Sequence, residues 1–178
     1  MKGKRIAAFA LALVLGTSAA QPALAADWQS KNPLIAHALG EADGKIETNS
    51  KEAFLTSWQN GFRAVEADFT YTSDGTLVVR HDFEKDGSYY RLEIKPSGAL
   101  VMDTKTFTAT PAVYEQTPMT AVDLLYLMQE YPDMYLITDT KTTDKAQVQK
   151  QFQDLVNIAN NIGAPEVLQR IIPQLYNK

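Results

Sequence analysis

The chain has no cysteine among its 178 residues and only two histidines. Disulfides and thiolate metal sites are therefore excluded, and stability must come from a hydrophobic core or from a bound ion. Positive charge is also scarce, with 17 lysines and arginines against 21 acidic residues and a net charge of −4. Without a basic stripe, the composition argues against a nucleic-acid partner. An anionic substrate would need a bound cation or a local lysine or arginine to receive it.

No apolar run is long enough to cross a bilayer, which takes roughly 20 residues. The longest, Ile6–Leu15, follows a basic start and precedes the small-residue sequence Ala23–Ala25. This pattern is typical of a secretory signal peptide rather than a membrane anchor. We therefore predict a signal peptide at residues 1–25, cleavage after Ala25, and a secreted or extracytoplasmic domain at residues 26–178.

The most informative stretch lies between residues 62 and 82. At strand period, Glu66 and Asp68 share one face, and apolar residues occupy the other. Adjacent carboxylates repel each other, so this arrangement indicates a cation between them or a proton on one of them. A turn at 72–75 and a second strand at 76–82, which carries His81, complete the unit. The alternative interpretation is an ordinary hairpin with a solvated acidic face.

The rest of the chain alternates between strand and helix patterns. We predict a strand at Leu34–His37, a helix at Ser50–Asn60 with Asn49 as its N-cap, a helix after Thr120 with Asp123 completing a capping box, a strand at Met134–Lys141, a helix at about Asp144–Ile162 and a strand at Arg170–Tyr176. Residues 83–107 are predicted to form an inserted hairpin beside the mouth of a site. Such alternation indicates an α/β fold with a parallel sheet and helices outside it.

Ionisable residues stand at the predicted strand ends: His37, Glu66 with Asp68, His81, and Asp139 with Lys141. The carboxyl ends of parallel strands face one rim, so we expect these side chains to meet there. The three carboxylates suit Ca²⁺ or Mg²⁺, and two imidazoles suit acid–base catalysis. The lysine would add positive charge for an anion such as phosphate. Alternatives are a zinc or iron site with histidine ligands, or purely structural roles for Asp139, Lys141 and Asn49.

The series resembles the glycerophosphodiester phosphodiesterase family of the phosphatidylinositol-phospholipase-C-like TIM barrels. The matching residues are His37, Asn49-Ser50, Ala53-Phe54, Gly61, Glu66-x-Asp68, Thr70, Asp74-Gly75, His81-Asp82 and Asp139-Thr140-Lys141. The resemblance implies a (β/α)₈ barrel that hydrolyses glycerol-linked phosphodiesters. It assigns acid–base catalysis to His37 and His81, metal binding to Glu66, Asp68 and Asp139, and substrate binding to Lys141 and Asn49.

Two positions depart from the family pattern. Ala38 follows His37 where the family has His-Arg-Gly, so a phosphate-binding arginine is missing. The family's Glu-Asn-Thr is Thr48-Asn49-Ser50 here, so a site carboxylate is absent unless Glu47 replaces it. Both departures indicate a divergent secreted branch that acts on a different small-molecule phosphodiester or lipid head group.

The length is the third departure, because a (β/α)₈ barrel typically needs about 250 residues. We count five strands and therefore expect the N-terminal part of a barrel with an open sheet edge, prone to self-association. Two hypotheses follow from the sequence: a metal-dependent phosphodiesterase, or a catalytically inactive, truncated extracytoplasmic domain that binds a metal or an anion.

Overall fold

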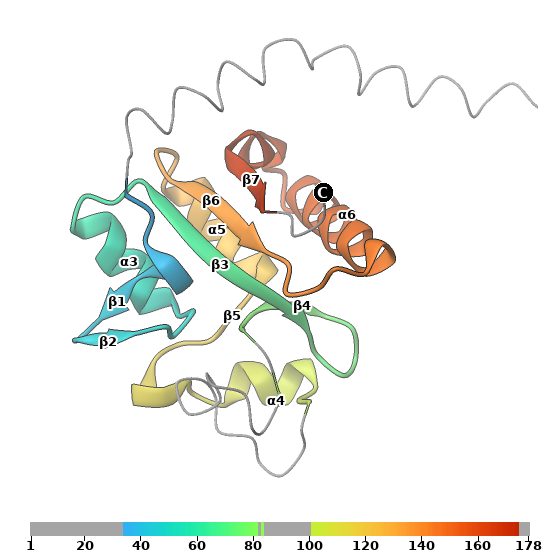
Figure 1. Ribbon diagram of the computed structural model, residues 1–178, viewed down its shortest axis with the longest axis horizontal. Helices are drawn as coiled ribbons and strands as arrows, with labels where there is room; N and C mark the ends of the chain where they lie inside the picture. Colours follow the sequence, from blue (N-terminus) through green and yellow to red (C-terminus); the bar gives the residue numbers. More distant parts are fainter. Residues whose placement is uncertain (1–33, 82, 84–100, 175–178) are drawn as a thin grey trace, which may run out of the picture. The chain divides into compact units, whose positions relative to one another are not determined.

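The computed structural model describes residues 34–81, 83 and 101–174. They contain a five-stranded sheet, in the order β5-β4-β3-β6-β7, and a separate two-stranded hairpin, β1-β2 (Figure 1). The strands are β1 Glu41–Ala42, β2 Lys45–Ile46, β3 Ala64–Tyr71, β4 Leu77–Val79, β5 Met119–Thr120, β6 Tyr135–Asp139 and β7 Ile171–Gln174. The α-helices are α3 Lys51–Gln59, α4 Thr104–Ala109, α5 Ala121–Glu130 and α6 Lys145–Asn161, and the 3₁₀ helices are η1 His37–Leu39, η3 Val113–Glu115 and η4 Pro165–Arg170.

The sheet is mixed rather than wholly parallel. Strands β3, β6 and β7 run parallel, as the alternating pattern predicts. Strand β4 is antiparallel to β3, and β5 is antiparallel to β4. The reason is the tight turn at 72–75, where the Gly75 N–H donates to the Thr72 carbonyl and Gly75 has a φ of +85°. A turn this short can join only antiparallel strands, because a parallel connection needs a long crossover.

The predicted strand at Leu34–His37 is wrong. Only Ala36 pairs with the sheet, through a single parallel bridge to Val65. The chain then turns into η1, where Ala38 and Leu39 both have positive φ values of 48° and 67°. Left-handed backbone ends strand pairing at once, so His37 lies at the start of a turn rather than at the end of a strand.

The core lies between the sheet and the helices. On β3, Val65, Ala67 and Phe69 alternate toward the apolar cluster, where side chains of α3, α5 and α6 join them. Phe54 on α3 is fully buried and meets the Tyr131 ring edge-on at 5.7 Å. Since strand residues alternate, this packing turns Glu66 and Asp68 to the opposite face of the sheet.

The helix ends confirm one predicted cap and correct another. Helix α5 begins with the predicted capping box, in which Thr120 and Asp123 bond each other's backbone N–H groups. Helix α3 is capped by Ser50, whose hydroxyl accepts from the Ala53 N–H, and not by Asn49. Asn49 has a φ of +51° and turns its side chain toward β3. Its predicted capping role is therefore taken by the next residue.

Some predictions lie outside the described residues, namely the signal peptide and most of the inserted hairpin, residues 84–100. The end of that predicted hairpin is wrong, because Thr104–Ala109 form helix α4, capped by Asp103. The β1-β2 hairpin, in which Glu41 pairs with Ile46, was not predicted from the sequence. Among the described helices, none combines the length and the hydrophobicity needed to span a bilayer.

Candidate metal and phosphodiester site

Three carboxylates meet where β3 and β6 lie side by side (Figure 1). The parallel register pairs Asp68 with Asp139 and Glu66 with Ile137. One oxygen from each of Glu66, Asp68 and Asp139 lies within 4.8 Å of the others. The three residues are only 6%, 1% and 5% exposed. The structure thus brings together the three residues that the sequence analysis assigned to a metal.

Lys141 provides a positive charge inside this cluster. Its ammonium nitrogen lies 2.7 Å from Asp68 Oδ1 and 2.5 Å from Asp139 Oδ2. Its backbone N–H also donates to Asp139 Oδ1 at 3.0 Å. Burial acts to lower the pKa of Lys141, but the hydrogen bonds and negative charges of Asp139 and Asp68 outweigh it, so that pKa lies above its usual value. Lys141 is therefore charged and neutralises part of the cluster.

Asn49 orients Asp68. Its Nδ2 donates to Asp68 Oδ2 at 2.7 Å, and its Oδ1 accepts from the Asp68 backbone N–H at 3.2 Å. Both ends of the amide are thereby engaged with one residue, in a position that is 2% exposed. The sequence analysis assigned Asn49 to substrate binding, and that role stays a prediction beside the contact with Asp68.

Glu66 differs from its neighbours in its proton affinity. Burial raises the pKa of Glu66 from 4.5 to about 7, and the charge of Asp68 adds to this effect. The Ala38 N–H, which donates to Glu66 Oε2 at 2.8 Å, and nearby His37 act in the opposite direction. The other oxygen, Glu66 Oε1, is buried and has no hydrogen-bond partner within the described part of the chain.

His37 lies beside the carboxylates, and His81 lies in the segment that follows β4. His37 Nε2 lies 3.7 Å from Glu66 Oε2, and its side chain is 57% exposed at the rim. His81 follows β4, which pairs Val79 with Phe69 and lets the Arg80 N–H donate to the Asp68 carbonyl at 2.9 Å. The antiparallel hairpin, and not a parallel strand end, thus brings the backbone of Arg80, the residue before His81, beside Asp68.

The sequence analysis missed two features that hold the site. The Ala38 N–H reaches Glu66 only because η1 has left-handed backbone, for which the sequence gives no signal. The same loop packs against α3 at Gly40. There the Ser57 hydroxyl donates to the Leu39 carbonyl at 2.7 Å. A Cβ at Gly40 would lie 1.9 Å from Ser57 Oγ, so glycine is required there. The Gly after His37-Ala-Leu could have indicated this close approach.

The donor set fits a hard divalent cation. Three carboxylates offer oxygen ligands of the kind that Ca²⁺ and Mg²⁺ take. The unpartnered Glu66 Oε1 is an unused acceptor in a buried position, where an uncompensated carboxylate is costly. Within the described residues the cluster contains no histidine, which argues against the zinc or iron alternative. A cation binding there would compete with Lys141.

Comparisons with known proteins give a family match over part of the chain. Residues 40–89 match the model of the glycerophosphoryl diester phosphodiesterase family. The matched stretch includes Glu66, Asp68 and His81 and excludes His37 and the end of β6. No curated protein is significantly similar in sequence to this chain.

Solved structures resemble the fold more widely. A glycerophosphodiester phosphodiesterase from Parabacteroides distasonis matches with a TM-score of 0.60 and 18% identity, over 80% of this chain and 56% of its own. One from Agrobacterium tumefaciens matches with a TM-score of 0.56 and 17% identity, over 80% and 57%. An Oleispira antarctica phosphodiesterase in complex with the product sn-glycerol-3-phosphate matches with 0.52 and 17%, over 71% and 51%.

The family resemblance predicted from the sequence is thereby confirmed over residues 40–89, and the fold resembles that of these solved phosphodiesterases. The predicted fold class is confirmed too: α/β of the TIM-barrel type, with part of the barrel present. The chain spans just over half the length of the solved structures that it matches.

Proposed function

We propose that this protein is a secreted, metal-dependent hydrolase of glycerol-linked phosphodiesters. The single observation that carries the proposal is the buried cluster of Glu66, Asp68 and Asp139, which two neighbouring strands bring within 4.8 Å. A family match over Glu66, Asp68 and His81 supports the same reaction class. The ion is Ca²⁺ or Mg²⁺, because all three ligands are hard oxygen donors. The predicted signal peptide supports an extracytoplasmic location.

The reaction adds water across one P–O ester bond and yields glycerol phosphate and an alcohol. A bound divalent cation would supply electrostatic stabilisation of the charge that develops on the phosphoryl oxygens. Glu66, Asp68 and Asp139 would hold it, and Asn49 keeps Asp68 oriented through two hydrogen bonds. Lys141, which pairs with Asp68 and Asp139 here, would supply positive charge for the phosphate if the ion took its place among the carboxylates.

The proton transfers fall to the two histidines. One imidazole takes a proton from the attacking water, and the other gives a proton to the departing alkoxide. His37 is exposed at the rim and lies 3.7 Å from Glu66, so it can reach both bulk water and the cluster. His81, in the segment that follows β4, is the second member of the pair.

The test is turnover of a glycerophosphodiester by the folded protein, measured as release of glycerol phosphate with and without a chelator. We expect activity that the chelator abolishes and that Ca²⁺ or Mg²⁺ restores. His37→Ala should lower kcat by about 10²–10⁴-fold, the usual contribution of a general acid or base. Chelator-resistant turnover, or an unchanged rate in His37→Ala, would refute the assignment.

The second candidate is a catalytically inactive domain that binds a metal or an anion. The observation that favours it is the match to little more than half of each solved relative, since the remaining part could supply further walls of the pocket. It predicts saturable cation binding without turnover in the same assay.

A further inference from the structure

Helix α6 buries a glutamine in its apolar row. The buried residues of the helix are Gln151, Leu155 and Ala159, which follow one another at four-residue spacing and so share one face. Leu155 and Ala159 belong to the hydrophobic core, whereas Gln151 is polar and only 4% exposed. An amide in such a position costs free energy unless its donors and acceptors are paired. Packing alone therefore does not account for Gln151.

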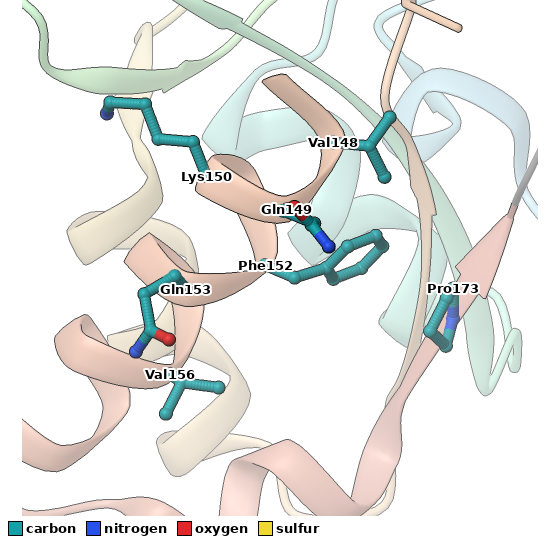
Figure 2. A pocket seen from close by; sticks show the side chains of 7 residues that line it. All are labelled: Val148, Gln149, Lys150, Phe152, Gln153, Val156 and Pro173. Atoms are coloured by element: carbon teal, nitrogen blue, oxygen red, sulfur yellow. The ribbon is translucent and has the colours of Figure 1, made fainter. Parts of the chain in front are cut away.

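Two exposed glutamines of the same helix form a contrast. Gln149 and Gln153 lie two positions before and after Gln151, so they are turned about 200° around the helix axis from it. Both are exposed, and with Pro173 of β7 they belong to the lining of an open groove (Figure 2). Water can satisfy their amides, whereas the fold must supply the partners of Gln151.

The buried amide of Gln151 has one hydrogen bond. Its Nε2 donates to the carbonyl oxygen of Thr140 at 3.2 Å, a buried contact that ties α6 to the residue after β6. Its Oε1 is buried and has no hydrogen-bond partner among the described residues. Methionine has a similar volume and would remove that unpaired acceptor. The bond to Thr140 is therefore the feature that the glutamine adds.

The bond from Gln151 acts on a peptide group that Asp139 also holds. The carbonyl of this peptide belongs to Thr140, and its N–H belongs to Lys141 and donates to Asp139 Oδ1 at 3.0 Å. The peptide is planar and rigid, so the two bonds fix it from both ends. Lys141 has a φ of +51°, a left-handed backbone that surrounding contacts must maintain. Loss of the Gln151 bond would let the peptide rotate and release the Asp139 carboxylate.

We propose that Gln151 is a positioning residue that fixes the carboxylate of Asp139 through the Thr140–Lys141 peptide. The inference rests on the proposed cation site, in which Asp139 is a ligand. Gln151 is not a member of the carboxylate cluster and acts on it through the backbone. A purely structural glutamine would instead affect the stability of the fold and leave the cation affinity unchanged.

The test compares Gln151→Met with the unmodified chain. In metal-free protein, hydrogen exchange of the Lys141 amide reports its bond to Asp139, and we expect exchange at least about tenfold faster in the variant. Calorimetric titration with Ca²⁺ or Mg²⁺ should give an affinity about tenfold lower, as is usual when the support of a metal ligand is removed. The thermal midpoint should shift by less than about 3 °C, because a hydrogen bond and an unpaired acceptor are lost together.

Two controls separate positioning from packing. Gln149→Met makes the same change at an exposed position and should alter none of the three measurements. Leu155→Ala, one turn along the buried row, leaves a cavity and should lower the thermal midpoint by more than about 5 °C. Well below that midpoint it should preserve both the cation affinity and the exchange of the Lys141 amide.

Unchanged exchange of the Lys141 amide in Gln151→Met overturns the proposal. An unchanged cation affinity in this variant, or an equal loss of affinity in Leu155→Ala, overturns it as well. If the unmodified chain binds neither cation, the proposed function is refuted instead, and the exchange measurement on metal-free protein still decides the role of Gln151.

Discussion

The ammonium group of Lys141 lies 2.7 Å from Asp68, inside the cluster that would receive a divalent cation. It also lies 2.5 Å from Asp139, so one side chain bridges the two neighbouring strands that build the site. Lysine and metal cannot both occupy this position among the carboxylates. In the metal-free protein the lysine thus limits the electrostatic repulsion that a cation would relieve.

Lys141→Gln should separate two effects of this lysine, which neutralises the carboxylates and competes with a cation for them. Without metal, the variant should lose about 2 kcal/mol of unfolding free energy, because removing one partner leaves buried carboxylates uncompensated. With Ca²⁺ or Mg²⁺ the loss should shrink, since the ion binds without competition. Denaturant unfolding with chelator and with excess cation measures both effects. Lys145→Gln, an exposed lysine on α6, is the control and should change neither. Equal destabilisation of Lys141→Gln in both conditions would contradict the competition.

Cation binding should depend on pH through Glu66. Its pKa is raised to about 7 by burial first and by the charge of Asp68 second. The metal-free protein thus holds a proton there that a cation must displace, so affinity should fall as the pH drops below about 7. Unfolding free energy of the metal-free protein should decrease as the pH rises from about 4.5 to about 7, where the folded state binds more protons than the unfolded state.

Calorimetric titrations at pH 6 and pH 8 measure the first effect, and urea unfolding with chelator measures the second. Glu66→Gln removes the titrating group and should abolish both trends while lowering the cation affinity. Cation affinity that is the same at both pH values in the unmodified chain would show that Glu66 does not take part in binding.

Asn49 is expected to act on the site through Asp68. Asn49→Ala removes two hydrogen bonds and places alanine at a φ of +51°, so we expect a loss of about 2 kcal/mol of stability and at least a tenfold loss in cation affinity. The control is Ser50→Ala, which removes the adjacent cap of α3 and costs about 1 kcal/mol of stability. It should leave cation affinity intact. If both variants weaken binding equally, the effect belongs to the fold and not to the orientation of Asp68.

Gly40 tests the docking of the loop that orients the Ala38 N–H. Gly40→Ala should cost more than about 2 kcal/mol, because its φ is +107° and the new Cβ would lie 1.9 Å from Ser57 Oγ. Gly44→Ala is the matched control, with a φ of +73° and open space around the added Cβ. It should cost about 1 kcal/mol. Thermal unfolding of the two variants decides the matter, and equal losses would mean that the contact with Ser57 is unimportant.

Sequence reasoning succeeded where local patterns decide the structure. Period-two alternation in β3 predicted that Glu66 and Asp68 share a face, and the Thr120–Asp123 spacing predicted a capping box. The position of Asp139 at a strand end predicted that its carboxylate lies near those of Glu66 and Asp68. Each of these features depends on residues close in sequence, or on the regular geometry of parallel strands.

Sequence reasoning failed where a neighbouring element overrides the local pattern. Asn49 has the sequence context of an N-cap, yet Ser50 caps the helix and Asn49 bonds Asp68, 19 residues away. The apolar stretch before His37 predicted a strand, but left-handed backbone at Ala38 ends it after one bridge. The contact of Lys141 with two carboxylates was also missed, because it exists only once β3 and β6 are neighbours.

The most direct test of the account is a calorimetric titration of chelator-treated protein at pH 8 with Ca²⁺ and with Mg²⁺. The account predicts saturable binding of one ion per folded chain, and at least a tenfold loss of affinity in Asp139→Asn, with the fold intact by circular dichroism. Absence of saturable binding of either ion, or binding that Asp139→Asn leaves unchanged, would contradict the claim that β3 and β6 build a cation site.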